Sequence, residues 1–245
     1  MSWSIAIVCE APADRETASS LAARVVCDAV NWMEPEYLVY RGFRPTDPHL
    51  LWIDVFTQAG TYRFPKIGLM RGEPGSPDAH AATRALLLLT RLKIDIGPVD
   101  AVFLIRDSDN DLSRRDGLNQ ARDREQWPFP VVIGFAHTKR ECWHIAGFQA
   151  EDEQEQQRLD ELNEELGGDP CTRSEELTAK HDYDKRSAKR VLKVLTNGDP
   201  ERQQRCLTAL PLDELARRGK NNGLADFLTE LRQHLLPLFG AVPPN

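Results

Sequence analysis

"VFLIRDSDNDLSRRDG", residues 102–117, joins an apolar run to closely spaced aspartates and then to a helical pattern. A run of apolar residues without alternation is typical of a strand buried on both faces of a parallel sheet. Asp107, Asp109 and Asp111 follow this strand two positions apart, and carboxylates so close repel one another unless a cation holds them together. The stretch therefore predicts a buried strand that ends in a cation-binding group.

The same apolar pattern recurs along the first half of the chain and predicts further strands over 4–10, 37–43, 50–58 and 129–137. Helical patterns occur over 13–31, 81–95, 113–126 and 138–148, and a turn-rich loop is expected over 71–80. Buried strands separated by helices predict an α/β fold, with a mostly parallel, Rossmann-like sheet covered by helices. Ligands bind beyond the carboxyl ends of such strands, so Glu10 and Asp107 are expected to meet at one edge if their strands are neighbours.

The character of the sequence changes near residue 150. Four helical segments follow, which are acidic over 149–170, basic over 183–196, polar over 199–219 and leucine-rich over 221–239. The leucines of the last segment recur at helical spacing, as they do in a helix that packs one face on a core. We therefore predict two parts, a metal-binding domain over 1–150 and an all-α C-terminal region over 151–245 that caps the sheet.

Composition narrows the class of protein. The chain has 245 residues, a net charge of −7 and 41% hydrophobic residues, which is typical of a soluble globular protein. No apolar run approaches the roughly 18–20 residues of a membrane span. Five scattered cysteines argue against a disulfide framework or a structural zinc site and favour the reducing cytoplasm. The negative charge argues against a protein that coats nucleic acid, but not against an enzyme that meets phosphates through bound metal ions.

The aspartate run admits several interpretations. An N-cap at the start of the helix over 113–126 explains one or two of the aspartates, because Asp is favoured there. A calcium loop of the EF-hand type is excluded, since Leu112 and Leu118 stand where it needs glycine and glutamate. A phosphoryl-aspartate enzyme of the haloacid-dehalogenase kind matches weakly, because its DxDx[TV] motif follows the first strand and here Asp111 stands in the last position.

A magnesium site for phosphodiester chemistry explains the whole run. Carboxylate oxygens are the hard ligands that Mg²⁺ and Mn²⁺ prefer, and such ions activate water and neutralise charge at a phosphate. This interpretation requires a further carboxylate at the end of another strand. Glu10 supplies it.

The order of these acidic residues resembles the Toprim domain of topoisomerases, primases and nucleases of the overcoming-lysogenization-defect (OLD) type. Glu10 and Asp14 in "VCEAPAD" (8–14) are similar to the ExxxD start of the OLD-type nucleases, and "IRDSDND" (105–111) matches the later DxD. The segment "HTKRECWHIAGF" (137–148) resembles a helix of small stand-alone Toprim proteins, in which a glutamate at the position of Glu141 joins the metal cluster. The chain departs from the family at Ala11, where the family has glycine.

The resemblance implies a Mg²⁺- or Mn²⁺-dependent endonuclease that acts on DNA, or on RNA, in antiviral (anti-phage) defence or DNA repair. The implied ligands of one or two metal ions are Glu10, Asp14, Asp107, Asp109, Asp111 and Glu141, and the implied catalytic residues are Glu10, Asp107, Asp109 and Lys139. Such proteins commonly act beside an ATPase. Because this chain has no GxxxxGK[ST] loop, the ATPase would be a separate subunit, and a homodimer is the other assembly implied.

Two other functions stay open beside the nuclease. One is a non-catalytic interaction subunit of a defence complex that kept the Toprim fold, and the other is a phosphohydrolase of small molecules with the same metal site. Individual residues also keep simpler roles: Asp14 suits the positive end of a helix dipole as well as a metal ion. His137 is a candidate for proton transfer or a solvated strand-end residue, whereas His144 is expected to be structural.

Basic side chains gather in the segment over 183–196. We expect one helix to carry Lys185, Arg186, Lys189 and Arg190 as nucleic-acid-binding residues, with Lys193 one turn further on. Such cations contact DNA phosphates, which position a protein on DNA without reading its sequence. The alternative is a solvated face that pairs with the acidic helix over 151–165.

Overall fold

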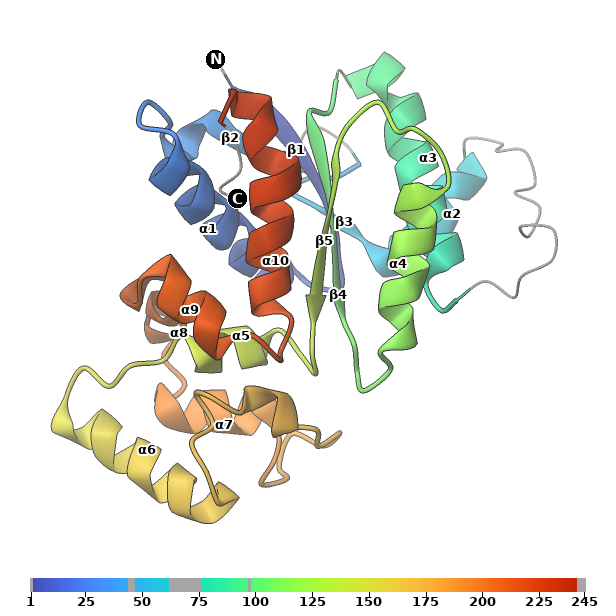
Figure 1. The fold of residues 1–245 in the computed structure, drawn as a ribbon. Helices are drawn as coiled ribbons and strands as arrows, with labels where there is room; N and C mark the ends of the chain where they lie inside the picture. The colour runs from blue at the N-terminus through green and yellow to red at the C-terminus, as the bar shows by residue number, and fades with distance from the viewer. Residues whose placement is uncertain (1, 44–46, 62–75, 97, 242–245) are drawn as a thin grey trace. The chain divides into compact units, whose positions relative to one another are not determined.

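A computed structural model describes residues 2–43, 47–61, 76–96 and 98–241 of the chain (Figure 1). The chain packs as two compact units. Unit 1 comprises Met1–Arg106, Asp111–Gly134 and Glu230–Asn245, and unit 2 comprises Asp107–Asn110 and Phe135–Thr229. This division by packing differs from the expected boundary at residue 150, and whether 1–150 folds as a domain by itself stays a prediction. Residues 71–75 of the expected loop lie outside the described residues.

Within the described residues the sheet has five strands, and the α/β class with a mostly parallel sheet is confirmed. The strands are β1 (Trp3–Cys9), β2 (Leu38–Arg41), β3 (Leu50–Leu51), β4 (Ala101–Asp107) and β5 (Val131–Ala136). Their order is β2-β1-β4-β5, with β3 also paired to β1. β1 pairs in parallel with β2, β3 and β4, and Val8 lies opposite Leu104. The central residues of β1 and β4 are fully buried, which is why both strands are continuous apolar runs in the sequence.

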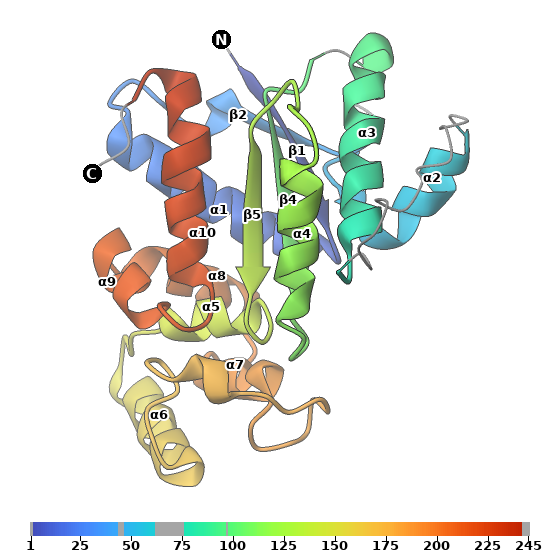
Figure 2. The same cartoon turned by 45° about the vertical axis from the view of Figure 1, so that its right-hand side comes forward.

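Helices cover both faces of the sheet in unit 1. They are α1 (Pro12–Ala29), α2 (Val55–Thr61), α3 (Ala79–Ile96) and α4 (Ser113–Asp123), with short helical turns η1 (Pro35–Tyr37), η2 (Trp52–Asp54), η4 (Leu231–Leu235) and η5 (Leu236–Phe239). α1 packs with η4 on one face, and α2, α3 and α4 pack together on the other (Figures 1 and 2). The helices expected over 13–31, 81–95 and 113–126 are therefore confirmed.

The strand expected over 50–58 is wrong beyond its first two residues. After β3 the chain turns into η2 and α2. Trp52, Val55 and Ala59 are buried at helical spacing, whereas Ile53 is 82% exposed. A short continuous apolar run is compatible with a strand or a helix, and here the spacing of the buried members decides for the helix.

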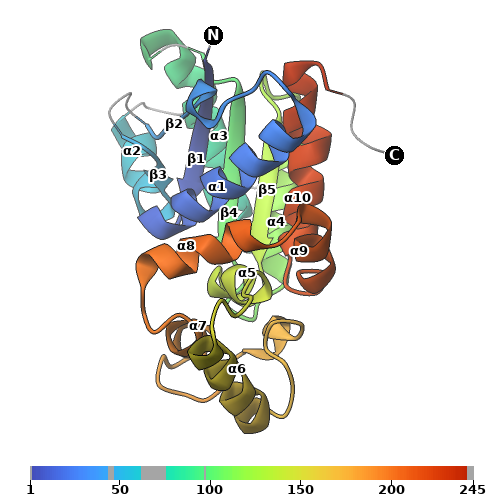
Figure 3. The ribbon, with the colours of Figure 1, turned by 90° about the vertical axis from the view of Figure 1, so that its left-hand side faces the viewer.

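Unit 2 is largely helical beyond the end of β5. Its helices are α5 (Glu141–Ala146), α6 (Glu153–Leu166), η3 (Ser174–Glu176), α7 (Ala188–Leu195), α8 (Pro200–Ala209), α9 (Leu212–Arg218) and α10 (Leu224–Glu230), whose last residue opens the C-terminal part of unit 1. Figure 3 shows α5 between α7 and α8, and α5 packs with both. The core of the unit contains Cys142, Ile145 and Phe148 of this region together with Leu192 and Leu195 of α7.

A buried ion pair joins α6 to α8 inside unit 2. Arg202 is 2% exposed, and its guanidinium donates to both carboxylate oxygens of Glu155, at 2.7 and 2.8 Å. It also donates to the carbonyl oxygen of Gln149 at 2.6 Å and lies over the ring of Phe148. The hydrogen bonds from Arg202 lower the pKa of Glu155, so the carboxylate is charged in the fold.

The basic helix is shorter than expected. α7 begins at Ala188, because the side chain of Ser187 caps the helix by accepting a hydrogen bond from the backbone N–H of Arg190. Lys185 and Arg186 therefore lie before the helix, and the expectation that all the basic residues share one helix is wrong.

Within the part of the chain that the structure describes, no helix is long and apolar enough to cross a membrane.

Candidate functional site

The acidic residues singled out in the sequence fall into both units. Glu10, Asp14 and Asp111 belong to unit 1, whereas Asp107, Asp109 and Glu141 belong to unit 2. Two groups organise them. We call Glu10, Asp78, Arg106 and Arg114 of unit 1 the Glu10 cluster, and Asp107–Asn110 of unit 2 the aspartate turn.

The Glu10 cluster lies where two neighbouring strands end. Glu10 directly follows β1, and Arg106 is the last residue but one of β4, which pairs with β1 in parallel. The Arg106 guanidinium is 2.7 Å from a carboxylate oxygen of Glu10 and donates to both oxygens of Asp78, at 2.9 and 3.1 Å. It also lies over the ring of Trp52, 5.7 Å from the ring centre.

A second arginine adds to this cluster from α4. Arg114 lies 3.6 Å from Asp78 and 4.0 Å from Glu10, so two guanidinium groups face two carboxylates. The sequence analysis missed this pairing. Arg106 was visible as a charge inside the apolar strand, but no sequence pattern pointed to Asp78, which lies 28 positions away from Arg106.

Asp14 and Asp111 act at helix starts. The Asp14 carboxylate is buried and accepts hydrogen bonds from the backbone N–H groups of Glu10 and Ala11, at 3.1 and 2.9 Å. Asp111 accepts from the backbone N–H and the hydroxyl of Ser113 at the start of α4, and the hydroxyl bond lowers the pKa of Asp111. Asp14 thus matches the helix-start interpretation, whereas the N-cap of α4 is Leu112 and the expected N-cap role of an aspartate is wrong for Asp111, which bonds Ser113 from the position before the cap. The metal-ligand role of Asp14 and Asp111 stays a prediction.

The aspartate turn is held by backbone hydrogen bonds to the segment after β5. Asp107 accepts from the N–H of Arg140 at 2.8 Å, and the N–H of Asp109 donates to the carbonyl of Thr138 at 3.1 Å. Asp109 and Asn110 both have positive φ angles, of 46° and 68°, a region that Asp and Asn enter more readily than most residues. The local backbone therefore fixes the direction in which the run leaves the strand.

Ser108 anchors the turn from inside unit 2. It is fully buried, and its hydroxyl lies 2.9 Å from Nδ1 of His137 and accepts from the N–H of Asn110 at 3.3 Å. His137 is half-buried, which lowers the pKa of its ring, and its backbone N–H donates to the carbonyl of Asn222 at 2.8 Å. His137 thus positions the residue between the two aspartates.

Asn222 is a buried polar hub behind His137. Its amide nitrogen donates to the carbonyl of Cys142 and to the hydroxyl of Ser174, and its amide oxygen accepts from the N–H of Leu224. The next residue has to be glycine: Gly223 has a φ of 86°, and a Cβ there would lie 2.0 Å from the Phe135 carbonyl oxygen. The turn formed by Asn222 and Gly223 therefore packs directly against the backbone at the end of β5.

Glu141 and Lys139 lie at the start of α5. One carboxylate oxygen of Glu141 accepts from the Arg140 guanidinium at 3.1 Å. Arg140 also donates to Nε2 of the buried His144, whose Nδ1 donates to the carbonyl of Gln203. Burial and the nearby Arg140 lower the pKa of His144 to about 3, and these contacts agree with its expected structural role. Among the described residues, the ammonium group of Lys139 forms no ion pair, and its catalytic role stays a prediction.

The donor chemistry of the acidic residues suits Mg²⁺ or Mn²⁺, since carboxylate oxygens are hard ligands. Within the residues that the structure describes, however, no group of three or more His, Cys, Asp or Glu side chains is arranged to hold a metal ion. Glu10 and Glu141 are instead neutralised by arginines. The metal site therefore stays a prediction.

The basic residues before and within α7 are largely paired with acidic ones. Arg190 donates to both carboxylate oxygens of Glu165 on α6, at 3.1 and 2.9 Å, and Lys189 lies 3.6 Å from Asp182. For Arg190 this matches the alternative of a face paired with the acidic helix. Its phosphate-binding role, like that of Lys189, stays a prediction.

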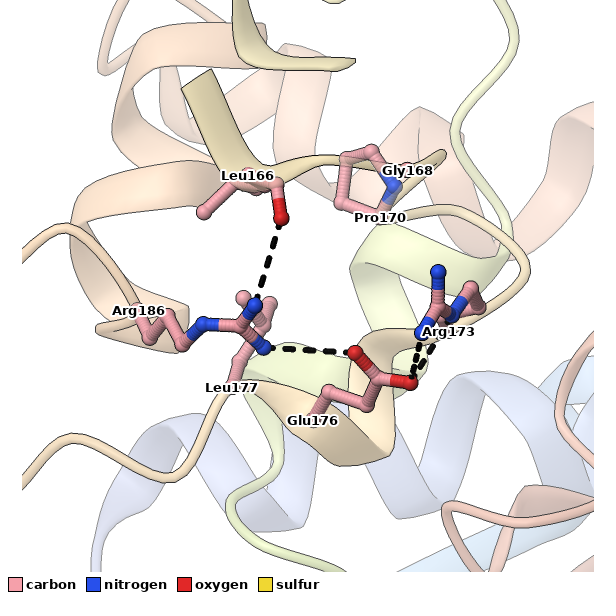
Figure 4. A pocket seen from close by; sticks show the side chains of 7 residues that line it. All are labelled: Leu166, Gly168, Pro170, Arg173, Glu176, Leu177 and Arg186. Carbon is pink, nitrogen blue, oxygen red and sulfur yellow. Dashed lines mark hydrogen bonds and ion pairs between the residues drawn. The ribbon is translucent and has the colours of Figure 1, made fainter. Parts of the chain in front are cut away.

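Arg186 lines a small pocket shown in Figure 4. Its guanidinium donates to the carbonyl of Leu166 and to one oxygen of Glu176, while Arg173 binds the other oxygen. The volume of about 10 Å³ holds about one water molecule. The polar groups of this pocket satisfy one another, so it offers no site for a substrate.

Comparisons with known proteins return no relative of this chain. No family model matches it, and no curated protein or solved structure is significantly similar to it. The Toprim resemblance thus rests on the sequence alone, namely on the order and spacing of the acidic residues and on the segment over 137–148.

Proposed function

We propose that this chain is a Toprim-like, Mg²⁺- or Mn²⁺-dependent nuclease that hydrolyses phosphodiester bonds of DNA in the cytoplasm. One observation carries the proposal: β1 and β4 are parallel neighbours, Glu10 directly follows β1, and β4 ends at Asp107. In open α/β sheets, ligands bind beyond the carboxyl ends of the strands. Acidic residues at two adjacent strand ends suit a metal-assisted attack on a phosphate.

Metal ligation would fall to the carboxylates of Glu10, Asp14, Asp107, Asp109, Asp111 and Glu141. A bound ion supplies an activated water and neutralises charge on the phosphate. The chain itself orients these oxygens in advance, because backbone N–H groups hold Asp14 and Asp107. Lys139 would hold a proton or a positive charge near the leaving oxygen.

The second candidate is a non-catalytic interaction subunit of a defence or repair complex. The observation that favours it is the pairing of Glu10 with Arg106 and of Glu141 with Arg140, at 2.7 and 3.1 Å. Carboxylates that are already neutralised by resident arginines need no metal ion. The partner of such a subunit would be a separate ATPase or a second copy of this chain.

Nicking of supercoiled plasmid in Mg²⁺ or Mn²⁺ tests the proposal. Glu10→Gln and Asp107→Asn keep the shape of each side chain and remove its charge, and Glu34→Gln is the matched control at an exposed position of unit 1. We expect metal-dependent nicking by the wild type and by the control Glu34→Gln. We expect Glu10→Gln and Asp107→Asn to lose this activity.

Other outcomes decide between the alternatives. Absence of nicking, with no Mn²⁺ binding by calorimetry, overturns the nuclease and leaves the interaction subunit. Mn²⁺ binding with hydrolysis of p-nitrophenyl phosphate, but without nicking, identifies a phosphohydrolase of small esters.

A further inference from the structure

The segment between η3 and α7 forms a small hairpin in unit 2. Thr178 and Ser187 make an antiparallel bridge, and the N–H of Ala179 donates to the carbonyl of Arg186 at 3.1 Å. At the tip, the N–H of Asp184 donates to the carbonyl of His181 at 3.1 Å. These bonds give a ten-residue polar segment a defined shape. We call Thr178–Ser187 the tip hairpin.

The tip hairpin presents an aromatic ring to water. The rings of His181 and Tyr183 are stacked, with centres 5.4 Å apart and planes inclined by 4°. Tyr183 is nevertheless 79% exposed. The Tyr183 ring therefore keeps most of its surface open to water while it is stacked on His181. An exposed aromatic face on an ordered loop is a platform on which a planar ligand can stack.

Cations flank this ring in the sequence "KHDYDKR" (180–186). Arg186 is bound to Glu176, but Lys180 and Lys185 make no ion pair with any residue that the structure describes. The residues next to Tyr183 are Asp182, which lies 3.6 Å from Lys189, and Asp184, so the two lysines stand further along the hairpin on either side. An exposed ring with cations on both sides is typical of surfaces that bind single-stranded nucleic acid, where bases stack on rings and cations contact phosphates.

The tip hairpin is also bonded to the aspartate turn. The side-chain amide of Asn110 donates to the carbonyl of Thr178, the first residue of the hairpin, at 3.1 Å. The hydroxyl of Thr138, whose carbonyl binds Asp109, donates to the carbonyl of Leu177 at 2.7 Å. A strand bound on the hairpin would therefore lie in the same unit as three of the predicted metal ligands, Asp107, Asp109 and Glu141.

We propose that the tip hairpin binds single-stranded nucleic acid, with an unpaired base stacked on Tyr183 and phosphates bound by Lys180 and Lys185. This inference rests on the proposed nuclease function and assigns its substrate class, which is nucleic acid with unpaired nucleotides beside the cleaved bond. Any base can stack on the ring, so the hairpin would distinguish single strands from double strands but would not distinguish one base sequence from another.

Fluorescence anisotropy with a labelled oligothymidylate in EDTA tests the inference without cleavage. We expect Tyr183→Ala to weaken binding about tenfold, which is within the range for the loss of one stacked base. Tyr183→Phe should bind like the wild type, because the ring and not the hydroxyl is the contact. Phe56→Ala, at an aromatic residue of unit 1 that is 48% exposed, is the matched control and should have no effect.

Lys180→Ala and Lys185→Ala should each weaken binding and reduce its dependence on salt, as expected when a phosphate contact is lost. Equal affinity of Tyr183→Ala and wild type, or no binding of the oligothymidylate by wild type, overturns the inference. If the protein nicks plasmid but Tyr183→Ala binds the oligothymidylate as tightly as the wild type does, the inference is wrong and the proposed nuclease stands. If Tyr183→Ala weakens binding of the oligothymidylate but the protein does not nick plasmid, the proposed nuclease is wrong and the binding site stands.

Discussion

The Glu10 cluster and the aspartate turn both hold acidic residues in place, but they use different partners. In the Glu10 cluster the partners are arginine side chains, and Glu10 itself is 34% exposed. In the aspartate turn they are backbone N–H groups and a chain of uncharged groups that runs from the buried Ser108 through the half-buried His137 to the buried Asn222.

The two groups differ in how far water reaches their polar side chains. Ion pairs that water reaches contribute little to stability, since water screens both charges. A buried polar group that loses its partner costs much more, because water cannot replace the lost bond. Unit 2 should therefore lose stability when one member of its polar interior is removed, whereas the Glu10 cluster should tolerate the loss of an arginine.

The largest effect is expected for Arg202→Leu in unit 2. The substitution leaves the buried Glu155 carboxylate with the N–H of Glu151 and, at 3.9 Å, the guanidinium of Arg158, but without its two short bonds, so we expect the free energy of unfolding to fall by about 3 kcal/mol in urea denaturation. Arg205→Leu on the same helix is the control. Arg205 is 47% exposed and pairs with Glu151 at the surface, where water screens the pair, so its loss should cost much less. Equal costs for the two variants would contradict the role assigned to burial.

A second test uses pH and His144. The folded state keeps this ring neutral down to a pKa of about 3, whereas the ordinary value is 6.5. Between these values the unfolded chain binds the additional proton, so stability is full above pH 6.5 and falls as the pH falls. The expected loss between pH 8 and pH 5 is about 2 kcal/mol. In His144→Gln this loss should be absent, whereas His80→Gln, at an exposed position of unit 1, should behave like the wild type.

The sequence predicted the sheet well because its central strands are buried on both faces. β1, β4 and β5 are continuous apolar runs, and their burial is what the pattern reports. The strand prediction over 50–58 was wrong because a continuous apolar run does not show which of its residues face the core. The start of α7 was missed because the cap residue Ser187 decides it, not the charge pattern.

The candidate site was predicted only in part. Carboxylates at strand ends follow from local sequence, and Glu10 and the aspartates were found in this way. Their partners depend on packing between distant segments: Ser108 and His137 lie 29 positions apart, and Arg106 and Asp78 lie 28 apart. No local pattern encodes such pairs, so the arginines of the Glu10 cluster and the hub at Asn222 appear only in the folded chain.

The Ser108–His137 bond offers an intermediate effect. Each of Ser108→Ala and His137→Ala should cost about 1 kcal/mol, and the double variant should cost less than the sum, because both remove the same bond. His137→Asn places an amide near the position of Nδ1 and should retain more stability than His137→Gln, whose amide lies near Nε2. Hydrogen exchange at the Asn110 amide, which donates to Ser108, should quicken in the alanine variants. Strictly additive costs would mean that the two side chains act independently.

The smallest effect is expected for Arg106→Gln in the Glu10 cluster. Arg106, like Arg202, makes several contacts, since it binds both Glu10 and Asp78 and lies over Trp52. A count of contacts alone would therefore predict a large loss. Solvent access predicts otherwise, because Glu10 is partly exposed and Arg114 remains beside both carboxylates.

We accordingly expect Arg106→Gln to lower the free energy of unfolding by about 1 kcal/mol or less at moderate salt. The loss should shrink further in high salt, since ions screen the charges that Arg106 balances. Arg114→Gln, which removes the longer contacts of the same cluster, is the matched control and should cost less still. A loss as large as that of Arg202→Leu, unchanged by salt, would show that the Glu10 cluster is as closed to water as the interior of unit 2.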